Sequence, residues 1–218
     1  MDPETIRNIA VYALPVLFAI TLHEAAHAYA AKYFGDNTAY AQGRMSLNPL
    51  VHVDLLGTIV IPIALYLFTP FVFGYAKPVP VDFSRLRNPK KQMAFVALAG
   101  PMANFIMAFM WLVLGLLLAY FQVEENFPHK VAQAGVFTNL LIFAFNLLPL
   151  PPLDGGRVLT SILPNNLAYK FARIEPYGFF IVLALIFVGV LGYWVVPVME
   201  VGRFLIHLIA APLTIFLS

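Results

Sequence analysis

The stretch that decides the fold is ITLHEAAHAYAAKYFG, residues 20–35. Its apolar and alanine-rich positions favour a helix, and the apolar run extends on the N-terminal side to residue 9. Three ionisable side chains, His23, Glu24 and His27, interrupt this run. Ionisable groups are costly in a lipid-spanning helix and are usually retained there for function. The stretch therefore predicts a membrane helix that carries a functional site.

The composition supports a membrane protein. Of the 218 residues, 61% are hydrophobic and 11% are charged, whereas a soluble domain carries about 25% charged residues. The net charge of +2 is too small to indicate a nucleic-acid partner. The chain has no cysteine, which excludes a disulfide framework and thiolate chemistry. We expect a multi-pass protein of the cell membrane, with the lipid bilayer as its surroundings.

Six apolar segments define the expected architecture: residues 9–31, 55–73, 93–121, 131–150, 177–199 and 204–217. They predict an all-α polytopic membrane protein with about five spanning helices. The first helix is expected to begin at Asp2-Pro3-Glu4 and to run to Phe34 before Gly35 ends it. We treat the chain as one membrane-embedded domain over 1–218, with its core motifs in 15–160 and C-terminal helices in 175–217.

Two loops and one apolar segment are expected to be irregular. Residues 36–54 carry strand and turn signals, and Lys77–Val81 is an extended run that contains Pro78 and Pro80, so we expect a small β element on the cytoplasmic side. Pro62 and Pro70 interrupt segment 55–73, which is compatible with a re-entrant segment. A spanning segment is the alternative.

His23-Glu24-Ala25-Ala26-His27 fits the pattern H-E-x-x-H. Residues i and i+4 of a helix share one face, so both imidazoles can reach the same ion. Neutral imidazole is a good zinc ligand, and the glutamate beside the first histidine can reach a water on the metal without binding it. This pattern predicts a zinc site with Glu24 as its acid–base group.

Catalytic zinc usually has three protein ligands, so a third is needed. Most acidic residues lie at segment ends or in the polar loops, but Asp154 follows a helix that Pro149, Pro151 and Pro152 break. Irregular backbone at membrane depth is tolerated where it lines a cavity, which makes Asp154 the candidate. The alternative is an ordinary helix exit into a surface loop.

Two further motifs accompany the histidines. Asn146, Pro149, Pro151, Asp154 and Gly155 fit N-x-x-P-x-P-x-x-D-G. Gly100, Pro101 and Asn104 fit the pattern G-P-x-x-N.

Together, in this order, the three motifs resemble those of the site-2 protease family of intramembrane zinc metalloproteases. The resemblance covers roughly residues 15–160. Residues 44–58 and the stretch GYAKPVP are similar to a small prokaryotic subgroup without a PDZ or CBS domain.

The resemblance implies one zinc ion per chain, bound by His23, His27 and Asp154, with Glu24 as the catalytic carboxylate. It also implies that Asn146 contacts the scissile peptide or the oxyanion. The function it implies is hydrolysis of a peptide bond within or near a transmembrane segment of membrane protein substrates.

Substrate contacts are expected from three residues, Asn104, Lys77 and Val79. A peptide bond in a helix is already hydrogen-bonded, so the substrate must unwind locally. The extended run Lys77–Val81 could pair with the unwound segment as an added strand. We therefore expect substrates with helix-breaking residues near the cut.

Metal binding requires the ligands to lie at one depth in the bilayer. The basic residues that follow Asp154 favour the cytoplasmic side. His23 and His27 lie in the C-terminal half of their helix, so we expect its N-terminus outside and the site toward the cytoplasm.

The alternative function is a non-catalytic zinc-binding membrane adaptor or a zinc carrier. A hydrolase of lipids or small amides would use a similar site. His52 and Asp54 could form a second metal site, although a hydrogen-bonded turn is the expected role. The roles of His207 and the oligomeric state stay open.

Overall fold

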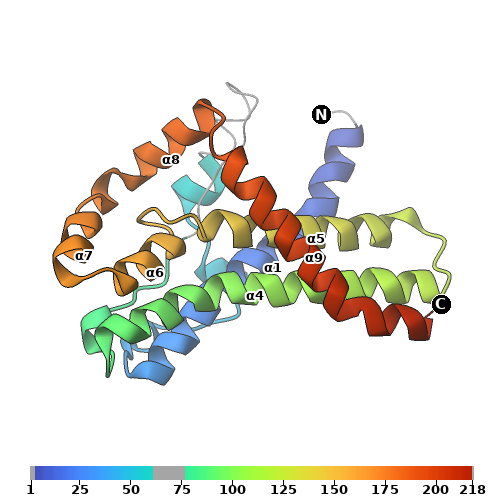
Figure 1. Cartoon of the computed structure of the whole chain (residues 1–218). Coiled ribbons are helices and arrows are strands. Elements are labelled where there is room, and N and C mark those ends of the chain that lie inside the picture. Colours follow the sequence, from blue (N-terminus) through green and yellow to red (C-terminus); the bar gives the residue numbers. More distant parts are fainter. Residues whose placement is uncertain (1–2, 61–76, 218) are drawn as a thin grey trace.

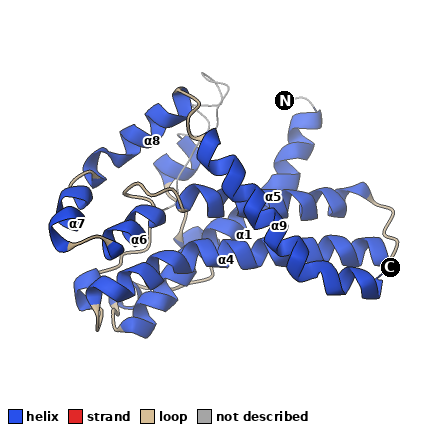
Figure 2. Ribbon diagram, in the orientation of Figure 1, coloured by secondary structure: helices blue, strands red, loops and turns tan. Residues whose placement is uncertain are grey.

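The structure is a computed structural model that describes residues 3–60 and 77–217. These residues are mostly helical and contain no strand (Figure 2). The elements, in order, are α1 (Pro3–Phe34), α2 (Thr38–Ala41), η1 (Pro49–Val51), η2 (Leu55–Val60), η3 (Phe83–Arg85), α4 (Pro89–Tyr120), α5 (Asn126–Asn146), α6 (Asp154–Ile162), α7 (Asn165–Ala172), η4 (Glu175–Tyr177), α8 (Gly178–Phe187) and α9 (Gly192–Leu217).

The first long helix has the predicted bounds. Pro3 opens α1, where its missing N–H would have had no helical partner. Gly35 follows Phe34 with a φ of +117°, a conformation that L side chains rarely adopt, and so ends the helix. Helix α1 therefore delivers His23 and His27 near its C-terminal end, as the sequence predicted.

Helix α4 lies at the centre of the bundle. It packs against α1, α5, α6 and α9, and α9 crosses α4 and α5 (Figure 1). The interface of α1 is made of small side chains that are at most 1% exposed: Ala19, Ala25, Ala28 and Ala31. Small residues allow helix backbones to approach closely. The result is a tight contact at the histidines.

Large apolar side chains cover the outer surface of the long helices. On α4, Met110 is 60% exposed and Ile106 is 57% exposed, and α1 and α9 show the same pattern. A soluble protein rarely exposes so much contiguous apolar surface. Within the described part of the chain, three helices are long and apolar enough to cross a membrane: α1, α4 and α9 over Gly192–Thr214. These features belong to a membrane protein.

The expected count of five spanning helices is not confirmed. Helix α5 has 21 residues but includes His129, Lys130 and Gln133, which lower its hydropathy. The apolar run 177–199 is divided because Gly189 adopts a φ of +76° after α8 ends. Helix α9 then continues through residues 200–203, where the sequence had suggested a boundary.

The small β element is also not confirmed. In the described part of the chain, residues 36–54 form α2 and η1, and residues 77–82 are extended without a strand partner. Most of segment 55–73 lies outside the described residues, so its spanning or re-entrant course stays a prediction.

His52 and Asp54 shape the turns before this segment. His52 is 1% exposed and donates from Nε2 to the Ser46 carbonyl at 2.8 Å, while Asp54 accepts from the Gly57 N–H at 2.7 Å. This confirms the expected hydrogen-bonding role. Neither residue belongs to a metal-binding group among the described residues.

Candidate metal centre

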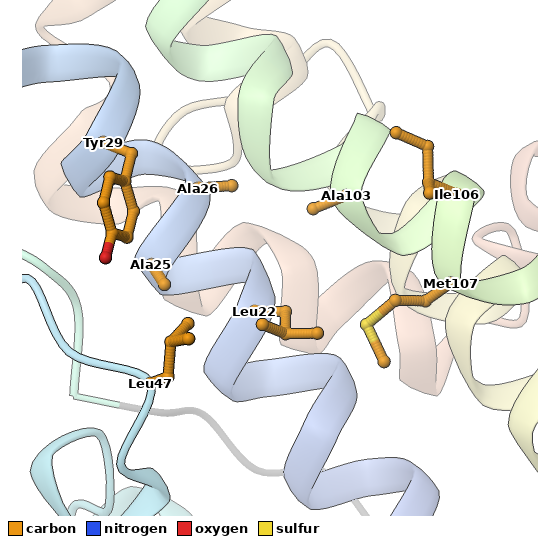
Figure 3. Close-up of a pocket in the computed structure, with 8 residues that line it drawn as sticks. All are labelled: Leu22, Ala25, Ala26, Tyr29, Leu47, Ala103, Ile106 and Met107. Carbon is orange, nitrogen blue, oxygen red and sulfur yellow. The ribbon is translucent and has the colours of Figure 1, made fainter. Parts of the chain in front are cut away.

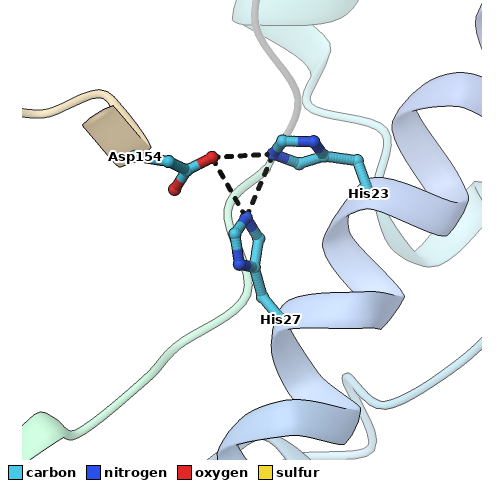
Figure 4. A group of neighbouring side chains, drawn as sticks. All are labelled: His23, His27 and Asp154. Atoms are coloured by element: carbon cyan, nitrogen blue, oxygen red, sulfur yellow. Dashed lines mark hydrogen bonds and ion pairs between the residues drawn. The ribbon is translucent and has the colours of Figure 1, made fainter. Parts of the chain in front are cut away.

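Three side chains from two distant parts of the chain converge in the bundle (Figure 4). His23 and His27 lie one turn apart on α1, and Asp154 is the first residue of α6. The two Nε2 atoms are 3.0 Å apart. The Asp154 Oδ2 atom lies 3.2 Å from Nε2 of His23 and 3.3 Å from Nε2 of His27. All three residues are buried.

Hydrogen bonds on the far side of each imidazole determine its tautomer. The Nδ1 atom of His27 lies 2.7 Å from the Val96 carbonyl, which can only accept, so Nδ1 donates. The Nδ1 atom of His23 lies 2.7 Å from Oδ1 of Asn104. The Asn104 amide donates from Nδ2 to the Ala19 carbonyl, at 3.0 Å, which identifies its other atom as the accepting oxygen. Both neutral imidazoles therefore present the Nε2 lone pair to Asp154.

This convergence of lone pairs suits a cation. Two imidazole nitrogens and a carboxylate oxygen face one point, and Asp154 Oδ2 is buried without a hydrogen-bond donor. Ligands at about 2.0–2.1 Å from a tetrahedral zinc ion lie about 3.3 Å from one another. The observed separations of 3.0–3.3 Å are close to that value. The residues therefore fit a zinc ion in both donor type and spacing.

Gly100 on α4 makes room for the two imidazoles. A Cβ atom at this position would lie 2.3 Å from Nε2 of His27 and 2.6 Å from Cε1 of His23. Such distances are far below van der Waals contact, so only glycine fits without movement of the rings. The G-P-x-x-N motif thus contributes its glycine to the shape of the site.

The break between α5 and α6 brings Asp154 to the histidines. Gly155 lies so close to the end of α5 that a Cβ atom would be 2.3 Å from the Leu147 carbonyl oxygen. A Cβ atom on Gly156 would likewise lie 2.3 Å from the backbone nitrogen of Pro151, in the proline loop. The glycine pair lets α6 begin directly beside the proline loop, which delivers Asp154 as a buried residue.

Glu24 lies beside this group and is hydrogen-bonded to the extended segment. Its Oε2 atom accepts from the Val79 N–H at 2.7 Å. Arg44 holds the same segment through the carbonyls of Lys77 and Pro78, at 2.9 and 3.3 Å. One carboxylate oxygen of Glu24 is thus occupied by the backbone, and its other oxygen remains for a reactant.

A cavity of about 120 Å³ joins these groups. Its lining residues include His23, Glu24, His27, Asp154, Asn146, Val79 and Arg157. Six of the eight predicted site residues therefore share one cavity. The Asn146 amide donates from Nδ2 to the Ile142 carbonyl at 3.0 Å, within its own helix, and its side chain is half-buried.

The other two predicted residues lie elsewhere. Lys77 is exposed at the start of the extended segment. Asn104 is fully buried behind His23, and its Nδ2 atom also donates to Oδ1 of Asn139 at 3.0 Å. In this position Asn104 contacts a histidine, whereas the sequence had suggested a contact with substrate.

Sequence reasoning did not assign roles to Gly100 or the Val96 carbonyl. The spacing of Asn104 after Gly100 within one motif is the signal that could have linked both residues to the histidines. The Val96 carbonyl has no sequence signal, because any residue supplies one.

A larger pocket of about 290 Å³ lies on another side of α1 (Figure 3). It is formed between α1 and α4, with Leu47 from the following loop at its edge. Its lining is almost wholly apolar and offers no metal ligand. The group of His23, His27 and Asp154 lines the smaller cavity.

Comparison with known proteins agrees with this site. The profile of peptidase family M50 matches residues 11–137 and 122–189. YwhC of Bacillus subtilis, whose name describes it as a candidate zinc metalloprotease, is 39% identical over 196 residues, covering 87% of this chain and 86% of YwhC. No solved structure gives a significant match.

Two other relatives have similar names. Rip2 of Mycolicibacterium smegmatis, also named as a candidate zinc metalloprotease, is 31% identical over 82% of this chain and 67% of Rip2. The zinc metalloprotease MJ0392 of Methanocaldococcus jannaschii is 24% identical over 73% of this chain but only 36% of its own length. Given the extent of the family match and the likeness to YwhC, this chain belongs to peptidase family M50, the site-2 protease family.

Proposed function

We propose that this chain is a zinc endopeptidase that hydrolyses a peptide bond within or near a transmembrane segment of its substrates. The observation that carries the proposal is the convergence of three lone-pair atoms at zinc-ligand spacing, with Glu24 on the same cavity. Family membership supports the same conclusion.

His23, His27 and Asp154 would hold one zinc ion and leave its fourth position open to the cavity. Zinc bound there would acidify a water molecule and polarise the scissile carbonyl. Asn104 and the Val96 carbonyl hold the two imidazoles by their Nδ1 atoms, which keeps the lone pairs aimed inward. We assign this positioning role to Asn104 in place of the predicted substrate contact.

Glu24 would take a proton from the attacking water and later donate it to the leaving amine. The Val79 N–H fixes one oxygen of the carboxylate, so the other can face the water. Asn146 lines the cavity and has a second amide N–H, which could donate to the developing oxyanion.

The extended segment beside Glu24 is the proposed substrate platform. Val79 and Val81 both line the cavity, and alternate residues of an extended segment face the same side. The carbonyl of Val79 and the backbone of Val81 would pair with an unwound substrate segment, with exposed Lys77 at the entrance. A substrate helix with a central Gly or Pro unwinds at lower cost.

The site is proposed to lie toward the cytoplasm. Lys90, at the start of α4, donates to Oδ1 of Asn165 on α7 at 2.7 Å, so two basic regions lie at the same end of the bundle. Basic residues accumulate on the cytoplasmic side of membrane proteins. The N-terminus of α1 would then lie outside.

A non-catalytic adaptor or zinc carrier is less well supported. Such a protein has no need for a carboxylate beside the metal ligands at a costly depth. The position of Glu24 on the cavity, aligned by a backbone N–H, therefore favours hydrolysis.

The test uses the full chain in proteoliposomes with a transmembrane peptide that carries a central Gly pair or Asn-Pro. We expect wild type and Glu125→Gln, a control in an exposed loop, to cut within the apolar segment. Glu24→Gln should retain zinc and lose activity by about 10²–10⁴-fold. Equal cleavage by Glu24→Gln would contradict the mechanism. Equal cleavage of a uniform Leu helix would contradict the unwinding requirement.

A further inference from the structure

Helix α9 carries charged side chains near the middle of a segment long enough to span the bilayer. Glu200 and Arg203 pair at 3.4 Å, and their side chains are 58% and 46% exposed. His207, one turn after Arg203, is also exposed. We call these three residues the polar flank of α9.

The polar flank lies too deep to reach the membrane surface. The candidate span runs from Gly192 to Thr214, which is about 34 Å at 1.5 Å per residue. Arg203 stands about 16 Å from either end, and snorkelling serves residues near helix ends. A charged group at this depth is costly when it faces lipid. A lipid-facing position is therefore unfavourable.

The flank is distinct from the face that α9 buries within the bundle. Val195, Met199, Gly202, Ile206 and Ala210 recur at three- and four-residue spacing and are buried. Successive residues are 100° apart around a helix, which places the polar flank roughly 60–120° from the centre of that face. The next sector round the helix is apolar and exposed, with Val201, Phe204 and Leu208.

We propose that the polar flank of α9 is the contact surface with a second copy of this chain in the membrane. Copies in one bilayer share an orientation, so a two-fold axis along the membrane normal brings equal depths together. Glu200 and Arg203 differ by about 4.5 Å in height, and each keeps hydrogen-bonding atoms beyond those of its own pair. The carboxylate of one copy can therefore reach the guanidinium of the other in both directions.

The charges of the polar flank favour a second copy of this chain as the partner. The flank carries both signs and is complementary to itself, whereas an apolar substrate helix offers no countercharge. Residues 61–76 of the same chain, which lie outside the described part, contain no charged residue and so supply no countercharge either.

The cysteine-free sequence allows a direct test by single-cysteine cross-linking. Val196 lies one turn before Glu200, on the same side of α9 as the polar flank, and is 58% exposed. Val201 lies in the apolar sector and is 59% exposed. Val196→Cys and Val201→Cys are matched in residue type and exposure. In membranes at low protein-to-lipid ratio, a short bismaleimide should yield dimers of Val196→Cys, with markedly less from Val201→Cys.

Charge reversal tests the ionic contact. In the Val196→Cys background, Glu200→Arg places like charges on both copies and should lower the dimer yield by about tenfold. The double exchange Glu200→Arg with Arg203→Glu should restore the yield, which separates repulsion from misfolding. The proposal would be overturned by equal dimer yields at positions 196 and 201, or by no dimer at either position. It would also be overturned if neither charge variant changed the dimer yield. Substrate cleavage does not enter this test, so its outcome is independent of the proposed activity.

Discussion

Gly100 tests the shape of the site at the scale of a single residue. A Cβ atom there would lie 2.3 Å from Nε2 of His27, so Gly100→Ala must displace an imidazole. We expect zinc affinity to fall by at least the 10–100-fold typical of lost support for a metal ligand. Competition with a chromophoric chelator measures this.

The matched control is Gly115→Ala on the same helix. There an added Cβ would meet only the Ala132 Cβ, at an ordinary 3.8 Å. Zinc affinity should be unchanged. A Gly100→Ala protein with wild-type affinity would show that the rings do not hold the metal in the observed arrangement.

Val79 tests the alignment of the Glu24 carboxylate, for which we propose a catalytic role. Val79→Pro removes the one N–H that Glu24 Oε2 accepts, in a segment already flanked by Pro78 and Pro80. We expect kcat to fall by up to about 10²-fold, because a small misplacement of a reacting group has effects of that size. Zinc content should be unchanged.

Val79→Ala is the control, because it keeps the N–H and shortens the side chain. A fall in kcat of the same size in both variants would assign the effect to side-chain packing. An unchanged kcat in Val79→Pro would show that Glu24 needs no backbone donor.

At the scale of the elements, Asp36 links the end of α1 to residues 77–82. The residue is 0% exposed and accepts from the Thr38 N–H at 2.9 Å and the Asp82 N–H at 2.7 Å. Asp36→Ala should leave both half-buried donors without this acceptor and lower the free energy of unfolding by about 1–3 kcal/mol. Thermal unfolding in detergent measures the change.

Asp82→Ala is a suitable comparison, because Asp82 is partly exposed and its side chain bonds only within its own turn, to Ser84 and Arg85. Its effect should be smaller. If both substitutions destabilise equally, the link through Asp36 has no special role in holding the segment.

Local sequence signals predicted the elements that depend on local chemistry. Pro3 and Gly35 bound α1 as expected, and H-E-x-x-H with Asp154 forms one group. The break at Gly189 was missed because glycine in an apolar run is also compatible with a continuous membrane helix. The contact of Asn104 with His23 was not predicted, because a motif shows that an asparagine matters without showing which neighbour it contacts.

At the scale of the whole molecule, the proposed orientation can be tested by labelling. Ser84 is exposed in the loop before α4, and the chain has no native cysteine. Ser84→Cys in intact cells should resist a membrane-impermeant maleimide and react after the membrane is permeabilised. An Asn126→Cys control at the opposite end of α4 should react without permeabilisation. The reverse pattern would place the site on the outer side.

The number of spanning helices could not be predicted from hydropathy alone. Segment lengths suggested five, whereas three described helices meet the requirements of length and composition. One polar residue of α5, Asn139, is buried against Asn104 of α4, whereas Lys130 and Gln133 are exposed. Tertiary contacts of this kind leave no periodic signal in the sequence.

The most direct test of the central claim is the zinc content of the purified chain, measured by mass spectrometry of the metal. We predict one zinc per chain for wild type and for Glu24→Gln, and a loss of nearly all zinc in Asp154→Ala, because Asp154 Oδ2 lies within 3.3 Å of both Nε2 atoms. Full zinc occupancy in Asp154→Ala, or none in wild type, would contradict a zinc site built from His23, His27 and Asp154.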